Sequence, residues 1–122
     1  MKYLVAIMIL VAQSAQAKWT AISEEIDGTQ YYIDMQSVRF NGSYRTYWSL
    51  ENSTRDKLSP YSIRQKEEID CAQERKRSLR YTRFDRLMAT GRVSLESDLT
   101  SQWQYIPPAS VEDTFLKLLC AP

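Results

Sequence analysis

The sequence NGSYRTYWSLEN, residues 41–52, contains a tight turn and the strand that follows it. Asn41-Gly42 favours the turn because both residues tolerate the positive φ angles of a short hairpin connection. Beyond the turn, side chains alternate between two sides of the chain, as they do in a β-strand. One side carries Tyr44, Thr46, Trp48 and Leu50, and the other carries Arg45, Tyr47, Ser49 and Glu51. This sequence therefore predicts a hairpin whose second strand buries one of its faces.

Strand patterns continue on both sides of this hairpin. Upstream, residues 19–26 and 30–34 are aromatic and β-branched runs separated by Asp27-Gly28, and residues 36–40 lead into Asn41. Downstream, residues 61–71 alternate again and predict a strand that is solvated on its charged side. The other expectations are a loop over residues 52–60, a polar connection over 72–76, an antiparallel strand over 78–87, a short strand over 92–95 and an exposed loop over 96–101.

The C-terminal residues change to a helical pattern. Ser110 is a favourable N-cap after Pro107-Pro108, and apolar residues then recur at helical spacing. These residues are Val111, Phe115, Leu118 and Leu119, with Glu112 and Asp113 in the first turn and Lys117 near the last. Strands followed by one amphipathic helix predict an α+β domain in which the helix packs on one face of an antiparallel sheet.

The two cysteines, Cys71 and Cys120, are expected to form one disulfide, because an even pair in a small exported domain is most simply oxidised. On the chain-entropy model such a bridge stabilises the fold by about 4 kcal/mol. A reactive thiol or a metal site is the alternative. Two cysteines without histidine make a poor zinc site, so we expect no metal.

The N-terminus has the pattern of a signal peptide over residues 1–17. Lys2 precedes an apolar run that is too short to span a bilayer, and Ala15 and Ala17 form a cleavage site. An uncleaved signal anchor is the alternative. Cleavage would leave residues 18–122 as one exported domain, with Lys18 rather than a cysteine at its start, so we expect no lipid anchor at this site. Removing Lys2 also balances the charge at 15 basic and 15 acidic residues.

The sequence offers little catalytic chemistry. It has no histidine, and a disulfide would remove both thiols. Glycine occurs only at positions 28, 42 and 91, so no phosphate-binding loop or nucleophile elbow is present. Glu68 and Asp70 could form an acid pair on one side of a strand, but Arg64 and Lys66 on the same side favour an exposed, ionised surface. We expect neither enzyme activity nor a cofactor.

Basic residues concentrate between positions 64 and 92. Strand alternation accounts for their spacing, and an exported protein seldom meets nucleic acid, so we expect no nucleic-acid binding. A surface that contacts an acidic protein or glycan is one interpretation, and a solvated charged face is the other. The predicted protein-binding patch consists of Arg75, Lys76, Arg77, Arg80, Tyr81 and Arg83.

Several short motifs follow one another in a recognisable order. They are Lys18-Trp19, Tyr31-Tyr32-Ile33-Asp34, Ser37-Val38, Trp48, Ser62, Asp70-Cys71, Gly91, Trp103, Ile106-Pro107-Pro108-Ala109-Ser110 and Cys120. Together they resemble the bacterial surface-adhesin protein E family over residues 18–121. The resemblance implies an antiparallel sheet of about six strands with a C-terminal helix packed on it. It also implies a surface adhesin that binds host extracellular proteins.

The leading interpretation is therefore a noncatalytic exported binding module. Its expected partner is a host extracellular-matrix protein or an envelope protein, and a homodimer is left open. Its expected location is the periplasm, the cell surface or the medium. The alternative function is a periplasmic structural or stress-related envelope factor.

Overall fold

The structure, a computed structural model, describes residues 3–6 and 17–121. Most of the predicted signal peptide, residues 1–2 and 7–16, lies outside the described residues. The elements are β1 (Trp19–Glu24), β2 (Gln30–Asn41), β3 (Tyr44–Ser53), β4 (Tyr61–Asp70), β5 (Arg75–Arg86), β6 (Thr90–Ser97), β7 (Gln104–Tyr105) and α1 (Val111–Cys120). α1, the helix among the described residues, is not long and apolar enough to cross a membrane.

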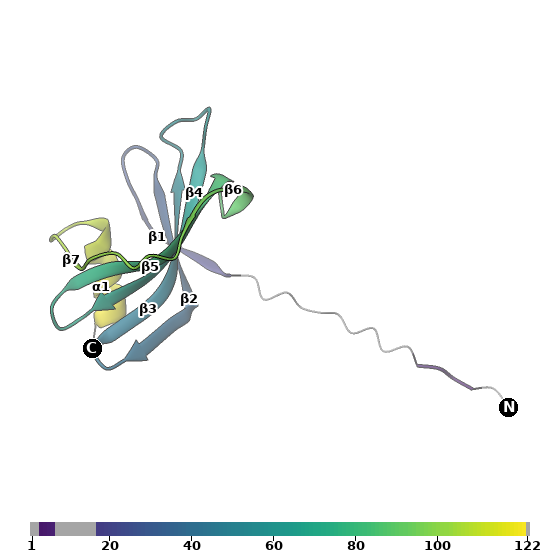
Figure 1. Ribbon diagram of the computed structural model, residues 1–122, viewed down its shortest axis with the longest axis horizontal. Coiled ribbons are helices and arrows are strands. Elements are labelled where there is room, and N and C mark those ends of the chain that lie inside the picture. Colours follow the sequence, from purple (N-terminus) through teal and green to yellow (C-terminus); the bar gives the residue numbers. More distant parts are fainter. Residues whose placement is uncertain (1–2, 7–16, 122) are drawn as a thin grey trace.

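All strands belong to one antiparallel sheet. β1 to β6 pair in chain order, and the short β7 pairs with the start of β5. Figure 1 shows that the sheet twists strongly, so that its strands cross in projection. The six main strands and the C-terminal helix confirm the α+β class expected from the sequence. The two-residue β7 lies beyond the loop predicted over residues 96–101 and was not anticipated.

Both predicted hairpin turns are present. Gly28 has a φ of 90° and Gly42 a φ of 58°, the left-handed conformations that glycine adopts most easily. The strands that flank them differ in length from the expectation. β2 is one continuous strand rather than two, because a register shift between Asp34 and Arg39 absorbs the interruption.

β5 begins earlier than the sequence pattern indicated. Residues 75 and 76 were expected in a polar connection, but they pair with the end of β4. Glu74, at a φ of 51°, closes a tight turn after Cys71, so Arg75 stands directly opposite Asp70. The turn is therefore shorter than its polar composition suggested.

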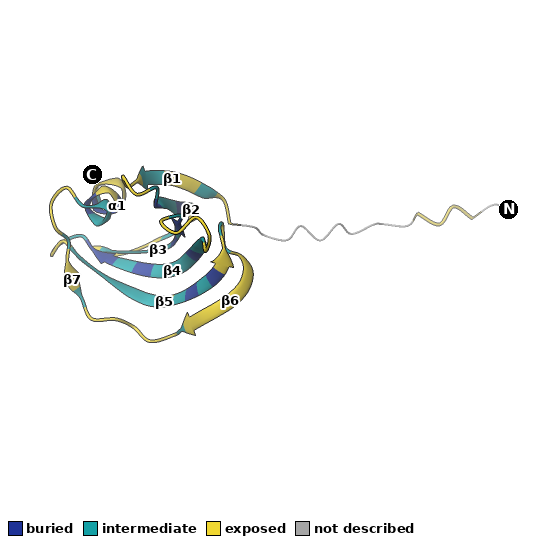
Figure 2. Ribbon diagram, turned by 90° about the horizontal axis from the view of Figure 1, so that it is seen from above, coloured by how far each residue is buried: buried dark blue, intermediate teal, exposed yellow. Residues whose placement is uncertain are grey.

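The main core lies between α1 and one side of the sheet, here called the helix face (Figure 2). Its buried residues are Ile33, Tyr47 and Ile69 from the sheet and Phe115, Leu116 and Leu119 from the helix. The ring of Tyr47 stacks on that of Phe115 with centroids 5.7 Å apart. These contacts remove the packed side of α1 from water, which is the main stabilising contribution to such a fold. Leu118, expected in the apolar pattern, is 43% exposed, and Leu116 is buried in its place.

A smaller buried region lies at one end of the opposite side of the sheet, here called the open face. Leu50 and Phe84 are buried there, although Leu50 alternates with the core residue Tyr47. The β5–β6 turn folds over this end, where Ser62 Oγ donates to the Arg86 carbonyl at 2.6 Å and accepts from Ala89 N at 2.9 Å. The expectation of a fully solvated face was thus wrong for Ser62, which has no exposed surface.

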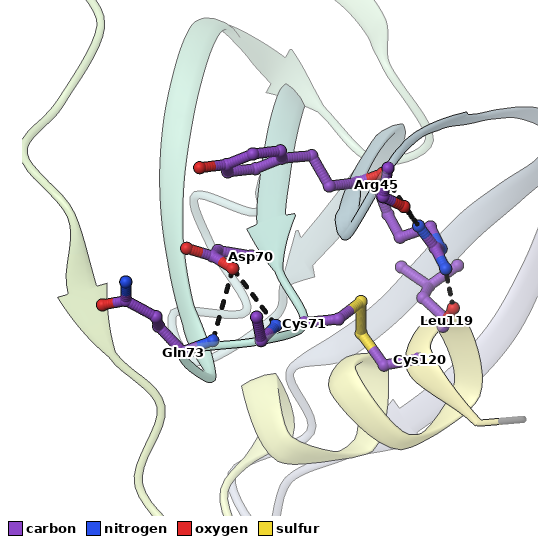
Figure 3. The surroundings of a disulfide bond; sticks show 9 residues. Arg45, Asp70, Cys71, Gln73, Leu119 and Cys120 are labelled. Carbon is purple, nitrogen blue, oxygen red and sulfur yellow. Dashed lines mark hydrogen bonds between the residues drawn. A yellow bond between two sulfur atoms is a disulfide. The ribbon is translucent and has the colours of Figure 1, made fainter.

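The start and the end of α1 are fixed by different contacts. Ser110 Oγ accepts from Asp113 N at 3.1 Å, which confirms the predicted N-cap. At the other end, Cys120 forms the predicted disulfide with Cys71, their Cα atoms 5.6 Å apart. Figure 3 shows Arg45 beside this bridge, where its Nε donates to the Leu119 carbonyl at 3.2 Å. A cation at the C-terminus of a helix also has the sign that the helix dipole favours.

Replacing both cysteines, Cys71→Ser with Cys120→Ser, should lower the free energy of unfolding by about 4 kcal/mol. The bridge joins residues 49 positions apart, and closing a loop of that length removes about this much entropy from the unfolded chain. Urea denaturation followed by circular dichroism measures the change. Reduction of the wild-type protein is the matched control, and a denaturation midpoint unchanged by either treatment would contradict the prediction.

Candidate functional site

Strand pairing lines up charged side chains on the open face. Arg75 stands opposite Asp70, and Arg77 stands opposite Glu68. Further along, Ser78 pairs with Glu67 and Arg80 pairs with Lys66. Leu79 is therefore one extra residue in β5 at a register shift. The extra residue changes the phase of the alternation, so that Arg80 joins Arg75 and Arg77 on the same face.

The predicted patch is consequently divided between two sides of β5. Arg75, Arg77 and Arg80 lie on the open face, whereas Lys76, Tyr81 and Arg83 lie on the helix face. The six residues therefore do not form one continuous contact surface. Alternation alone separates Lys76 from Arg75 and Arg77, but it also places Arg80 with Lys76 and places Tyr81 and Arg83 with Arg75. The register shift reverses that second assignment, and the sequence does not show it.

Trp103 lies against two guanidinium groups of the open face. The guanidinium carbons of Arg75 and Arg77 are 4.6 and 4.3 Å from the centre of its ring, and the Tyr44 ring centroid is 6.1 Å away. These distances suit cation–π contacts. We call Tyr44, Arg75, Arg77 and Trp103 the tryptophan cluster. It is a half-buried group of two aromatic rings and two arginines that the sequence alone did not bring together.

The two carboxylates of the predicted acid pair are held by these same arginines. Arg75 Nε lies 3.0 Å from Asp70 Oδ2, and Arg77 Nη2 lies 2.7 Å from Glu68 Oε1. Asp70 also accepts from the backbone N–H groups of Ala72 and Gln73, which closes the β4–β5 turn. Both acids thus have structural partners. The partners come from the neighbouring strand, not from Arg64 and Lys66 as the sequence suggested.

A groove of about 600 Å³ crosses the open face near β1. Its walls include Trp19, Trp48, Arg64 and Arg80. The groove and the tryptophan cluster lie on the same face of the sheet, because Trp48 and Tyr44 share one side of β3. The open face therefore has two regions in which arginine and aromatic side chains are combined.

The helix face contains a buried polar cluster that the sequence analysis missed. Glu67 is only 5% exposed. Its carboxylate accepts from Ser49 Oγ at 2.7 Å and from both Tyr47 Oη and Lys76 Nζ at 3.0 Å. Burial, followed by the charge of Glu67, raises the pKa of Tyr47 well above its ordinary value. In the sequence, Glu67 alternates on the same side of the predicted strand as the apolar residues Ile63 and Ile69, which indicates a buried carboxylate.

Beside this cluster is a partly open cavity of about 110 Å³, lined in part by Glu51, Glu67 and Glu112. Burial, and then the nearby charges of Glu25 and Glu67, raise the pKa of Glu51. The cavity is smaller than the usual ligand pocket of roughly 300 Å³ or more. Among residues 3–6 and 17–121, no three cysteines or acidic residues form a metal-binding group. We therefore place the candidate site on the open face.

Comparison with known proteins finds one matching family and several similar structures. The family model described as surface-adhesin protein E matches residues 19–121. Crystal form II of Haemophilus influenzae protein E is similar in structure, with a TM-score of 0.66 and 14% identity over 88% of this chain and 91% of that chain. Its selenomethionine form gives a TM-score of 0.63 with 16% identity over 88% and 89% of the two chains.

The structure of protein E from non-typeable Haemophilus influenzae is also similar. Its TM-score is 0.56 at 15% identity, over 89% of this chain and 79% of that chain. A search of the curated proteins found no significant match. Identities this low establish a shared fold, and they transfer no individual binding residue.

Glu51→Gln should stabilise the protein at neutral pH and leave its stability unchanged in acid. A raised pKa means that the folded state binds the Glu51 proton more tightly than the unfolded state does. The stabilisation that comes from this tighter proton binding is fully present below the unfolded-state pKa, and it is lost as the pH rises through the folded-state pKa. Glutamine resembles the protonated carboxyl at every pH and avoids the loss.

Thermal denaturation from about pH 4 to about pH 8, spanning the ordinary range of a carboxyl group and neutrality, measures this difference. Glu24→Gln is the matched control, because Glu24 is an exposed strand glutamate and loses the same charge without the burial. A Glu51→Gln protein that was less stable than wild type at neutral pH would contradict the prediction.

Proposed function

Because the chain belongs to the surface-adhesin protein E family, we propose that it is an exported, noncatalytic module that binds a host extracellular protein through its open face. The tryptophan cluster carries this proposal. It presents aromatic rings and guanidinium groups together, and these side chains dominate the binding energy of many protein interfaces.

The charges of the tryptophan cluster support protein contact over catalysis. Asp70 and Glu68 are within ion-pair distance of Arg75 and Arg77, so these carboxylates hold the arginine planes against Trp103. A pre-ordered arginine loses less side-chain entropy on binding than a free one does. The arrangement therefore suits recognition of a partner surface.

The other face of the sheet is less suited to this role. α1 covers its apolar part, and Lys76 is engaged with Glu67 at 3.0 Å. The guanidinium carbon of Arg83, further along β5 than Lys76, lies 3.9 Å from the centre of the Tyr61 ring. We accordingly restrict the contact patch first predicted from the sequence to its open-face members, Arg75, Arg77 and Arg80, and add Trp103.

Arg77→Gln should weaken binding to immobilised host-matrix proteins by about tenfold, the effect typical of an interface residue that contributes strongly. Arg83→Gln is the matched control. Arg83 is also on β5 and also lies against an aromatic ring, that of Tyr61, but it is on the helix face. Surface plasmon resonance with the mature domain measures both affinities, and circular dichroism checks that both variants fold. Equal affinities for the two variants would count against the open face.

We also expect the protein to be exported and cleaved after Ala17. Mass spectrometry of the protein from the cell envelope and the medium should show a chain that begins at Lys18 and contains one disulfide. Protease added to whole cells should remove it if it is a surface adhesin. Retention of residues 1–17 would contradict cleavage, and complete protection from protease would favour the periplasmic structural or stress-related factor.

A further inference from the structure

The groove on the open face is richer in cations than the tryptophan cluster. Arg39, Arg64 and Arg80 line it, together with a single carboxylate, Asp34. Arg80 is 3.9 Å from Asp98, and both side chains are largely exposed, so this pair is weak. In the described part of the chain, no carboxylate lies within ion-pair distance of Arg39 or Arg64. The groove therefore has an excess of positive charge.

Arg64 is held in place by aromatic rings. Its guanidinium carbon lies 5.7 Å from the Trp48 ring centre and 5.2 Å from that of Phe84. Its Nε is buried and has no hydrogen-bond partner among the described residues. The planar guanidinium can bind both oxygens of a carboxylate, and a position fixed by two rings lowers the entropy lost when it does so.

We propose that this groove binds an extended acidic segment of the partner protein. Carboxylates of the segment pair with Arg64 and with Arg39 or Arg80, and its apolar atoms lie against Trp19 and Trp48. The inference rests on the proposed function, because it names the chemistry of the partner that the open face would meet. It also divides the open face into an acid-binding groove and a neighbouring aromatic contact surface.

The polar groups of the groove favour a peptide over an acidic sugar. Sugar hydroxyls need acceptors, and Asp34 already accepts from Gln36 N at 3.1 Å. Ser37 Oγ donates to the Asp34 carbonyl at 2.6 Å and accepts from Trp48 N at 2.9 Å. Ser37 Oγ is therefore used within the protein, and one oxygen of Asp34 is used as well. The groove offers few acceptors beside three arginines and two tryptophans, which matches carboxylates on a chain with few hydroxyls.

Cleavage of the signal peptide would add to this charge. Ala17, the residue before the expected cleavage site, lines the groove. In the mature chain Ala17 is gone and the α-amino group of Lys18 takes its place at that end. An α-amino group has an ordinary pKa near 8, so it is mostly protonated at neutral pH. Maturation therefore opens this end of the groove and makes it more cationic.

The test uses the mature, folded domain and a synthetic peptide of alternating glutamate and alanine. Isothermal titration calorimetry should detect binding that weakens with added salt, and the same peptide with glutamine in place of glutamate should not bind. Arg64→Gln should weaken binding by about tenfold, as expected for loss of a two-oxygen contact with arginine. Arg92→Gln, which changes an exposed arginine on β6, should leave it unchanged.

Two further measurements locate the binding and test the role of the N-terminus. In NMR spectra the indole N–H signals of Trp19 and Trp48 should move on titration, and that of Trp103 should not. A chain that retains residues 15–17 should bind the peptide more weakly than one that begins at Lys18. Movement of the Trp103 signal alone would overturn the groove assignment.

The inference and the proposed function fail in different ways. Tighter binding of an oligogalacturonate than of the acidic peptide would overturn the choice of a peptide. Binding of a host protein that depends on Arg77 but is unaffected by Arg64→Gln or by excess acidic peptide would overturn the groove and leave the proposed function intact. Binding of the peptide without any host-protein affinity would overturn the proposed function alone.

Discussion

The packing of α1 on the helix face is the contact on which the rest of the structure depends. Phe115, Leu116 and Leu119 cover the apolar centre of the sheet, and the Cys71–Cys120 bridge holds the last turn of the helix against the end of β4. With one face closed in this way, a charge buried beneath the helix needs partners, as Glu67 has, and most of the charged side chains of β4 and β5 lie on the other side or at the edge of the helix. The cationic and aromatic open face follows from this division.

The sequence predicted the features that depend on local chemistry. Asp27-Gly28 and Asn41-Gly42 form turns because glycine adopts a positive φ, and Ser110 caps the helix through its own hydroxyl. The disulfide was predictable because only two cysteines exist. The α+β class followed from the change of period between the strands and the terminal helix.

Features that depend on contacts between distant residues could not be predicted in this way. Alternation assigns residues to two faces but does not show which face the helix covers, so both Tyr47 and Leu50 turned out to be buried, on opposite sides of β3. Trp103 reaches the arginines of β5 only because β7 returns to pair with that strand. The groove needs residues from β1 to β5, and no local pattern connects them.

The register shift in β5 decides which of its side chains share a face. The extra residue separates the strand into two segments, one carrying Arg75 and Arg77 and the other carrying Arg80. If Leu79 paired with Lys66 in place of Arg80, every later side chain of β5 would turn to the opposite face. Arg80 would then leave the groove, which would keep two of its three arginines.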